Sequence, residues 1–165
     1  MSEAPHGDRE SQPGEDPRAS SAQQAPGGDS YTWYRRGLDL LGRGSPAAAA
    51  QLLERAAEAE PGARSVLEAL GRAQFDTGRY AQAADSFRQI VEASPSDDYA
   101  HFGLGLALAR SGDPAAAAEH LALAAAMRPE LRHYTEALRG VRATLRARAQ
   151  AAAADPAGPA SEEPS

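Results

Sequence analysis

The chain has 165 residues and no cysteine, which excludes disulfide bonds, thiol catalysis and thiolate metal sites. Its formal charge of −6 at pH 7 is unevenly spread, because residues 1–29 carry −4, residues 151–165 carry −3 and the middle carries +1. A near-neutral middle argues against nucleic acid as the main ligand, and the lack of a long apolar run predicts no membrane-spanning helix.

The first 29 residues are rich in glycine, proline, serine, glutamine and acidic side chains, and they have no periodic apolar positions. Such a segment cannot bury enough apolar surface to offset the entropy of ordering, so we expect it to be disordered. It also lacks the apolar core of a secretory signal, from which we expect a cytoplasmic protein. We expect residues 151–165, with three prolines, to form a second disordered tail. The absence of lysine and asparagine, whose codons are AT-rich, indicates a GC-rich bacterial genome.

Between the tails, glycine and proline recur at a fixed interval of 34 residues. The three series are Gly37, Gly71 and Gly105; Gly44, Gly78 and Gly112; and Pro61, Pro95 and Pro129. A helical period of this length predicts an all-α stack of antiparallel helix pairs, an α-solenoid in which neighbouring units bury each other's apolar faces. The predicted units are residues 30–63, 64–97 and 98–131.

Local chemistry predicts where the helices of each unit begin and end. The first helices should end near Gly44, Gly78 and Gly112, because glycine adopts the left-handed conformation that closes a helix. Ser45–Pro46 and Asp113–Pro114 each supply an N-cap acceptor followed by proline at the first helical position, whereas Arg79–Tyr80 is a weaker cap. The second helices should end just before Pro61, Pro95 and Pro129, since the residue preceding a proline disfavours helical geometry.

After Leu131 the period stops but the helical pattern continues. Tyr134, Leu138, Val141 and Leu145 are spaced four, three and four residues apart, which places them on one face of a helix. We expect residues 132–150 to form a capping helix that covers the apolar end of the third unit, as the end units of stacked arrays must.

In these units the chain resembles the tetratricopeptide repeat (TPR) family, whose fold is a right-handed stack of antiparallel helix pairs. The family pattern has small residues where helix axes approach and large residues between units. In this chain the small positions are Gly37, Ala49, Ala56 and their equivalents, and the large ones are Leu53, Phe87 and Leu121. Arg36, Gln74 and His101 depart from the pattern. The resemblance implies a non-enzymatic scaffold that binds a protein partner.

The resemblance also implies where that partner binds, because the first helix of each pair lines a concave groove in this family. The residues at the groove-facing positions are Tyr31, Tyr34, Leu38, Glu68, Arg72, Phe75, Asp76, Tyr99, Phe102, Leu106 and Arg110. Five of the nine aromatic residues fall in this set, and aromatic and arginine side chains are the usual anchors of interfaces. We expect a peptide or helix to lie in the groove. The alternative is that Tyr34, Phe75 and Phe102 are half-buried scaffold.

One specialisation of the family is a clamp of Lys, Asn and Arg that holds the C-terminal carboxylate of a chaperone. Its positions correspond to Tyr34, Leu38, Ala69, Tyr99 and Gly103. Because none of these residues is basic or an amide, we expect no clamp and no chaperone tail as ligand.

The remaining polar residues give no pattern for a metal, a cofactor or catalysis. Of four histidines, His101 occupies a core position and should be buried and hydrogen-bonded. His120 and His133 lack a partner three or four residues away, as a zinc pair on one helix would need. No nucleophile–base order, phosphate loop or paired-carboxylate motif is found, so we expect no enzyme and no cofactor.

The main alternative site is the arginine face of the capping helix. Its basic residues are Arg132, Arg139, Arg142, Arg146 and Arg148, with only Glu136 to balance them. A solvated outer face is the simplest interpretation, and a surface that binds RNA or an acidic partner is the alternative.

Overall fold

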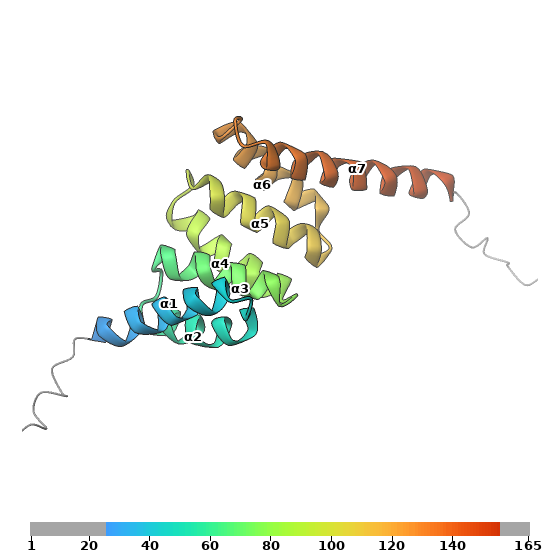
Figure 1. Ribbon diagram of the computed structural model, residues 1–165. Helices are drawn as coiled ribbons and strands as arrows, with labels where there is room; N and C mark the ends of the chain where they lie inside the picture. Colours follow the sequence, from blue (N-terminus) through green and yellow to red (C-terminus); the bar gives the residue numbers. More distant parts are fainter. Residues whose placement is uncertain (1–25, 156–165) are drawn as a thin grey trace, which may run out of the picture.

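The computed structural model describes residues 26–155, which fold into seven α-helices without any strand (Figure 1). In chain order they are α1 (Pro26–Gly42), α2 (Pro46–Ala59), α3 (Arg64–Asp76), α4 (Tyr80–Ala93), α5 (Asp98–Ser111), α6 (Pro114–Met127) and α7 (Arg132–Ala154). The all-α prediction is confirmed. The disorder predicted for residues 1–25 and 156–165 lies outside the described residues.

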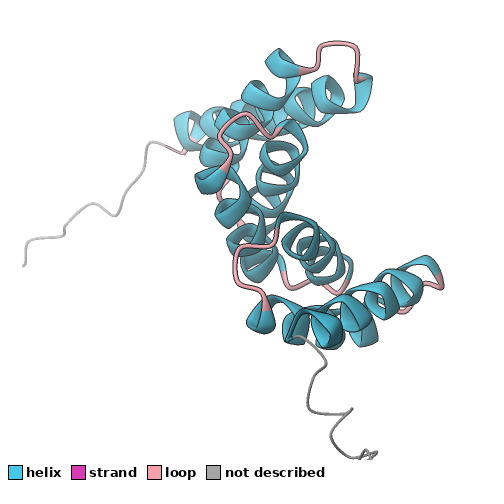
Figure 2. Ribbon diagram, turned by 90° about the vertical axis from the view of Figure 1, so that its left-hand side faces the viewer, coloured by secondary structure: helices cyan, strands magenta, loops and turns pink. Residues whose placement is uncertain are grey.

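The helices stack in sequence order, as α1–α2, α3–α4 and α5–α6 pairs, followed by α7. The backbones of α1, α3 and α5 approach one another, whereas within residues 26–155 those of α2, α4 and α6 do not. The first helix of each pair is therefore closer to its counterpart in the next pair than the second helix is. Such a stack must curve, with the first helices on the inner side of the curve. The concave side is therefore formed by α1, α3 and α5, and Figure 2 shows the resulting arc.

The helix ends follow the predicted chemistry at most positions. Gly44, Gly78 and Gly112 all have positive φ, between 73° and 99°, in the left-handed region predicted for them. At the start of α6 the Asp113 carboxylate accepts a hydrogen bond from the Ala116 amide at 3.0 Å. The predicted cap at Ser45 is wrong, because its side chain makes no capping bond. Ser45 and Asp113 have similar backbone angles, so the shorter serine side chain fails to reach the amide that the aspartate reaches.

Both outer helices extend beyond the predicted boundaries. The first begins at Pro26 instead of residue 30, with proline at the first helical position, and Ser30 is buried where its hydroxyl donates to the Ala56 carbonyl at 3.4 Å. The last helix continues to Ala154, four residues past the predicted end at residue 150. Its final residues are mostly alanine, the strongest helix former, which explains the extension.

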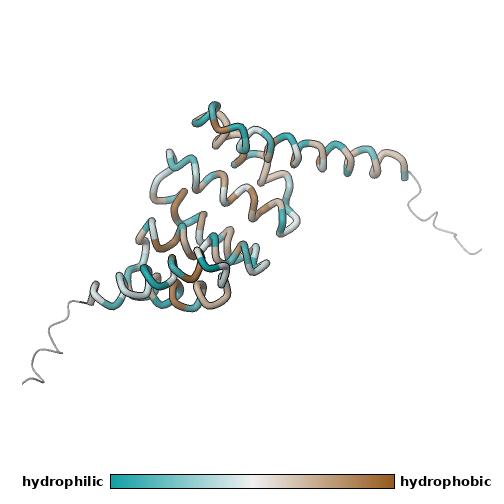
Figure 3. Tube along the Cα trace, viewed as in Figure 1, coloured by the Kyte–Doolittle hydropathy of each residue, from teal (hydrophilic) through white to brown (hydrophobic). Residues whose placement is uncertain are grey.

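The core consists of the predicted large and small residues. Leu53, Phe87 and Leu121 are each at most 2% exposed, and they lie against helix glycines that leave room for them. Hydrophobic and hydrophilic residues are interspersed along each helix of the stack, and hydrophilic residues recur along α7 (Figure 3). Of the helices formed by residues 26–155, none combines the length and apolar character needed to cross a bilayer.

Candidate functional site

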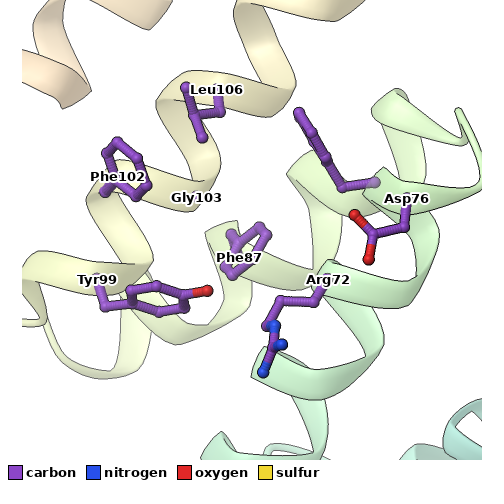
Figure 4. A pocket seen from close by; sticks show the side chains of 8 residues that line it. Arg72, Asp76, Phe87, Tyr99, Phe102, Gly103 and Leu106 are labelled. Carbon is purple, nitrogen blue, oxygen red and sulfur yellow. The ribbon is translucent and has the colours of Figure 1, made fainter. Parts of the chain in front are cut away.

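A hollow of about 210 Å³ opens on the concave side between α3 and α5 (Figure 4). Its walls and floor are Arg72, Phe75, Asp76, Phe87, Tyr99, Phe102, Gly103 and Leu106. Six of these eight belong to the groove-facing set that the sequence predicts. The fold thus gathers more than half of that set around one cavity.

Helical spacing explains why these side chains meet. Arg72, Phe75 and Asp76 are three and four residues apart on α3, so they share one face. On α5, Tyr99, Phe102 and Leu106 are three and four residues apart in the same way. Figure 4 shows the two sets on opposite walls, with the Tyr99 hydroxyl directed across the hollow toward α3.

Aromatic contacts hold the α5 wall in place. The Tyr99 ring lies edge-on to Phe87, with centroids 6.2 Å apart, and 6.4 Å from the Phe102 ring. Phe102 in turn stacks on Tyr134 of α7 at 4.5 Å and 22°. Tyr99 therefore packs on the core as well as lining the hollow.

The polar groups of the hollow lie at its edge. Arg72 and Asp76 are exposed, one helical turn apart, and they form no ion pair within residues 26–155. Burial raises the pKa of the Tyr99 hydroxyl above its ordinary value, an effect that the positive charge of Arg72 partly offsets. At neutral pH the hollow therefore has an apolar interior, a neutral phenol and one charge of each sign at the edge.

The sequence alone does not identify two residues as part of the hollow. Phe87 forms its floor and Gly103 part of its wall. A glycine inside a helix costs about 1 kcal/mol relative to alanine, so Gly103 already indicates a local packing requirement. Its neighbour is the Phe87 ring, which comes from the preceding unit and which the period does not pair with residue 103.

The other predicted groove residues lie elsewhere. Tyr31, which is 61% exposed, and Tyr34 line a second hollow of about 440 Å³ near the start of α3, together with Ser30, Glu60, Ala63, Arg64, Ser65 and Val66. Leu38 packs against the core of the first two units.

Two predicted groove residues already have partners within the chain. Glu68 forms an ion pair with Arg64, with a nitrogen–oxygen distance of 2.9 Å. The Arg110 guanidinium lies over the rings of Phe75 and Tyr80, 5.6 and 5.7 Å from their centroids. These contacts stabilise the scaffold, and a ligand would have to compete with them for either side chain.

His101 is buried, as the sequence predicts, and it is hydrogen-bonded on both sides of its ring. Its Nε2 atom lies 2.9 Å from the Pro95 carbonyl oxygen, and its Nδ1 atom lies 3.0 Å from Nδ1 of His120 on α6. Across the described ranges, no group of three or more His, Cys, Asp or Glu residues is placed to hold a metal ion.

The capping helix is attached by its first half. Tyr134 is 2% exposed and donates a hydrogen bond from its hydroxyl to the Asp98 carboxylate at 2.9 Å, and Leu138 is also buried. Val141 and Leu145 are half-buried, and every residue from Arg146 to Asp155 is exposed. The arginines of α7 are all exposed on the part of the chain that the structure describes.

A family model with the description "Tetratricopeptide repeat" matches two overlapping ranges, residues 34–98 and 69–131. The search of curated proteins found no significant match. Many solved structures share the fold.

Three of these structures illustrate the range of matches. The first TPR of Spaghetti (RPAP3) bound to the HSP90 peptide SRMEEVD is 17% identical with a TM-score of 0.67, covering 71% of this chain and 93% of that one. MamA from Desulfovibrio magneticus RS-1 is 21% identical with a TM-score of 0.69, covering 81% and 73%. YrrB, a TPR protein with an unusual peptide-binding site, is 21% identical with a TM-score of 0.64, covering 74% and 61%. At such identities the likeness shows the fold alone.

Proposed function

This chain belongs to the tetratricopeptide repeat family, and we propose that it is a scaffold whose concave side binds a peptide or helix of a protein partner. The hollow between α3 and α5 is the observation that carries the proposal. In it, the partner inserts a bulky apolar side chain.

The size and lining of the hollow favour a side chain over a free metabolite. Its volume of about 210 Å³ lies below the about 300–1,000 Å³ typical of small-molecule pockets. Aromatic and aliphatic groups form its interior, which suits an apolar anchor of a longer chain. Two proteins of similar fold, RPAP3 bound to an HSP90 peptide and YrrB with its unusual peptide-binding site, support the same mode of action here.

The charges at the edge of the hollow define the segment further. Arg72 favours an acidic group beside the inserted side chain, and Asp76 favours a basic group one helical turn away. The clamp positions for a chaperone carboxylate hold Tyr34, Leu38, Ala69, Tyr99 and Gly103, none of which is basic. We therefore propose an internal segment of the partner as the ligand.

We propose binding without catalysis. The eight residues that line the hollow include no serine, threonine, histidine or lysine, and no hydrogen bond within residues 26–155 pairs the Tyr99 hydroxyl with the Asp76 carboxylate. The only titratable groups among them are a guanidinium, an exposed carboxylate and a phenol whose pKa burial raises.

The test is partner capture with a variant that fills the hollow. Leu106→Trp places a large ring in the cavity, and Leu123→Trp is the matched control, because Leu123 is 46% exposed on α6 outside the hollow. Full-length bait proteins are incubated with lysate of the cells that produce the protein, and retained proteins are identified by mass spectrometry. The proposal predicts a partner that the wild type and Leu123→Trp retain and Leu106→Trp loses. Equal retention by all three baits rejects the hollow.

A second candidate is the arginine face of α7. Arg132, Arg139 and Arg146 recur every seven residues on the side away from the buried Tyr134 and Leu138. Such a stripe would attract an acidic partner surface or RNA through charge alone. Residues 30–131 carry 10 arginines and 13 acidic residues, a net charge of −3, which disfavours RNA beside the stack and favours the groove as the main site.

A further inference from the structure

Two histidines meet between the helices of the third unit. His101 of α5 is 4% exposed, and His120 of α6 is half-buried beside it. Their rings are 5.3 Å apart and close to parallel, at 29°, and the two Nδ1 atoms are 3.0 Å apart. The positions equivalent to His101 in the first two units hold Trp33 and Leu67, so this contact is particular to the third unit.

The hydrogen bonds determine the tautomer of each ring. The Pro95 carbonyl oxygen only accepts, so Nε2 of His101 carries a hydrogen and donates it. In neutral His101 the Nδ1 atom is then an acceptor, and the hydrogen between the rings must belong to Nδ1 of His120. The remaining nitrogen of His120, Nε2, holds a free lone pair.

This arrangement can take up one proton but not two. A first proton can bind to Nε2 of His120, which leaves the bond between the rings intact. A second proton would have to bind to Nδ1 of His101, and two N–H donors would then face each other at 3.0 Å. The contact has to open before both rings are charged.

We propose that His101 and His120 form a proton-sensitive latch, which holds α5 against α6 at neutral pH and loosens the third unit when acid protonates the rings. The latch also joins α5 to the turn before it, through the Pro95 carbonyl. Since α5 supplies Tyr99, Phe102 and Leu106 to the hollow, its loosening would weaken the groove. That last consequence rests on the proposed function, whereas the latch itself does not.

The charged groups around the two histidines shift the pKa of His120 in opposite directions. Burial, followed by the charge on His101, lowers the pKa of His120 below its ordinary value of 6.5; Glu119 of α6 opposes this shift and Arg88 of α4 adds to it. At the start of α5, the Asp97 carboxylate lies close enough to interact with a charge on His101, but it is already paired with Arg64 of α3.

The sign of the pH dependence follows from the lowered pKa of His120. Below about pH 6.5 the unfolded chain binds a proton that the folded state takes up less readily. The unfolded state then holds more protons, so the stability of the folded protein decreases as the pH falls below about 6.5.

The first test measures urea unfolding of the full chain by circular dichroism between pH 7.5 and 5.5, with EDTA present to exclude metal binding. The wild type should show an unfolding constant that rises with acid, up to about tenfold per pH unit for each excluded proton. His120→Gln should flatten this rise, because the amide still donates to His101 and can also rotate to accept from it. His133→Gln, at an exposed histidine of α7, should keep the wild-type slope. Parallel slopes for the wild type and His120→Gln would overturn the latch.

The second test needs no variant. Nitrogen-15 shifts of the imidazole rings at pH 7.5 report which ring nitrogen carries the hydrogen. The latch predicts hydrogen on Nε2 of His101 and on Nδ1 of His120. Any other pair of tautomers in the folded protein contradicts it. A latch that fails these tests leaves the capture experiment on Leu106→Trp unaffected, so the two proposals can fail separately.

Discussion

The aromatic ring of Phe87 lies where a side chain at Gly103 would begin, with its Cε1 and Cζ atoms 2.6 Å from the ideal Cβ position of residue 103. The same ring lies 2.8 Å from the ideal Cβ position of Gly71. Phe87 thus fills the space between α3 and α5, and both helices must lack a side chain where they face it. Its position sets the distance between the two walls of the hollow.

We predict opposite effects for one substitution at two helix glycines. Gly103→Ala should lower the free energy of unfolding by about 1–3 kcal/mol, because the added methyl overpacks Phe87. Gly140→Ala, on α7 with open space around it, should raise it by about 0.5–1 kcal/mol through the reduced entropy of the unfolded chain. Urea denaturation measures both. A stability gain for Gly103→Ala equal to that of Gly140→Ala would show that Phe87 is not tightly held.

Two truncations should separate the halves of α7. Ending the chain after residue 145 should change stability by no more than about 0.5 kcal/mol, because every described residue beyond it is exposed. Ending it after residue 131 should cost about 3–6 kcal/mol, since Tyr134 and Leu138 are buried and each such side chain contributes about 1.5–3 kcal/mol. Equal melting temperatures for the two truncated proteins would mean that α7 is not a cap.

Tyr134→Phe should weaken the attachment of α7 and change the alkaline stability. Loss of the bond to Asp98 should cost about 1–2 kcal/mol at neutral pH, as the carboxylate is partly solvated. Burial, and then Asp98, raises the pKa of Tyr134 well above its ordinary value of 10.0. Above about pH 10 the folded state therefore keeps a proton that the unfolded state loses, and stability decreases as the pH rises.

The measurement is urea unfolding of the wild type and Tyr134→Phe between pH 8 and pH 11. The variant should lose stability less steeply above pH 10 than the wild type. Tyr31→Phe is the control, because it removes the hydroxyl of a ring that is 61% exposed. If the wild type and Tyr134→Phe have the same alkaline slope, the bond to Asp98 does not exist in solution.

The sequence was sufficient for the fold because glycine, proline and apolar residues recur in register. Each turn glycine and each core position is determined by neighbours within its own unit or by the equivalent contact in the next. The same reasoning failed at the Ser45 cap, because a serine side chain is too short to reach the amide that Asp113 reaches at nearly the same backbone angles. It also missed His120 as the partner of His101, because that contact depends on how α5 and α6 are rotated against each other.

For the candidate site, the sequence predicted six of the eight residues that line the hollow, but not which of the predicted groove residues already have partners within the chain. The Arg110 guanidinium lies over the rings of Phe75 and Tyr80, and Glu68 forms an ion pair with Arg64. The contact of Arg110 depends on the distance between α5 and the second unit, which a repeat pattern does not contain, whereas the Arg64–Glu68 pair follows from a spacing of four residues on one helix. Whether the hollow binds a partner remains a prediction.

Charge reversal on α7 distinguishes the two candidate surfaces. Arg139→Glu, Arg142→Glu and Arg146→Glu, combined in one protein, should leave the fold intact because all three side chains are exposed. If the groove is the main site, the captured partner should still bind, with little dependence on salt concentration. Loss of the partner, together with steep salt dependence in the wild type, would assign binding to the arginine face.

The most direct test is a map of amide chemical-shift changes on the nitrogen-15-labelled full chain when the binding segment of the captured partner is added. The groove proposal predicts the largest changes on α3 and α5, around Arg72, Phe75, Tyr99 and Leu106, with α7 beyond Leu145 unchanged. Changes confined to α7, or to the outer helices α2, α4 and α6 while the hollow stays unperturbed, would contradict it.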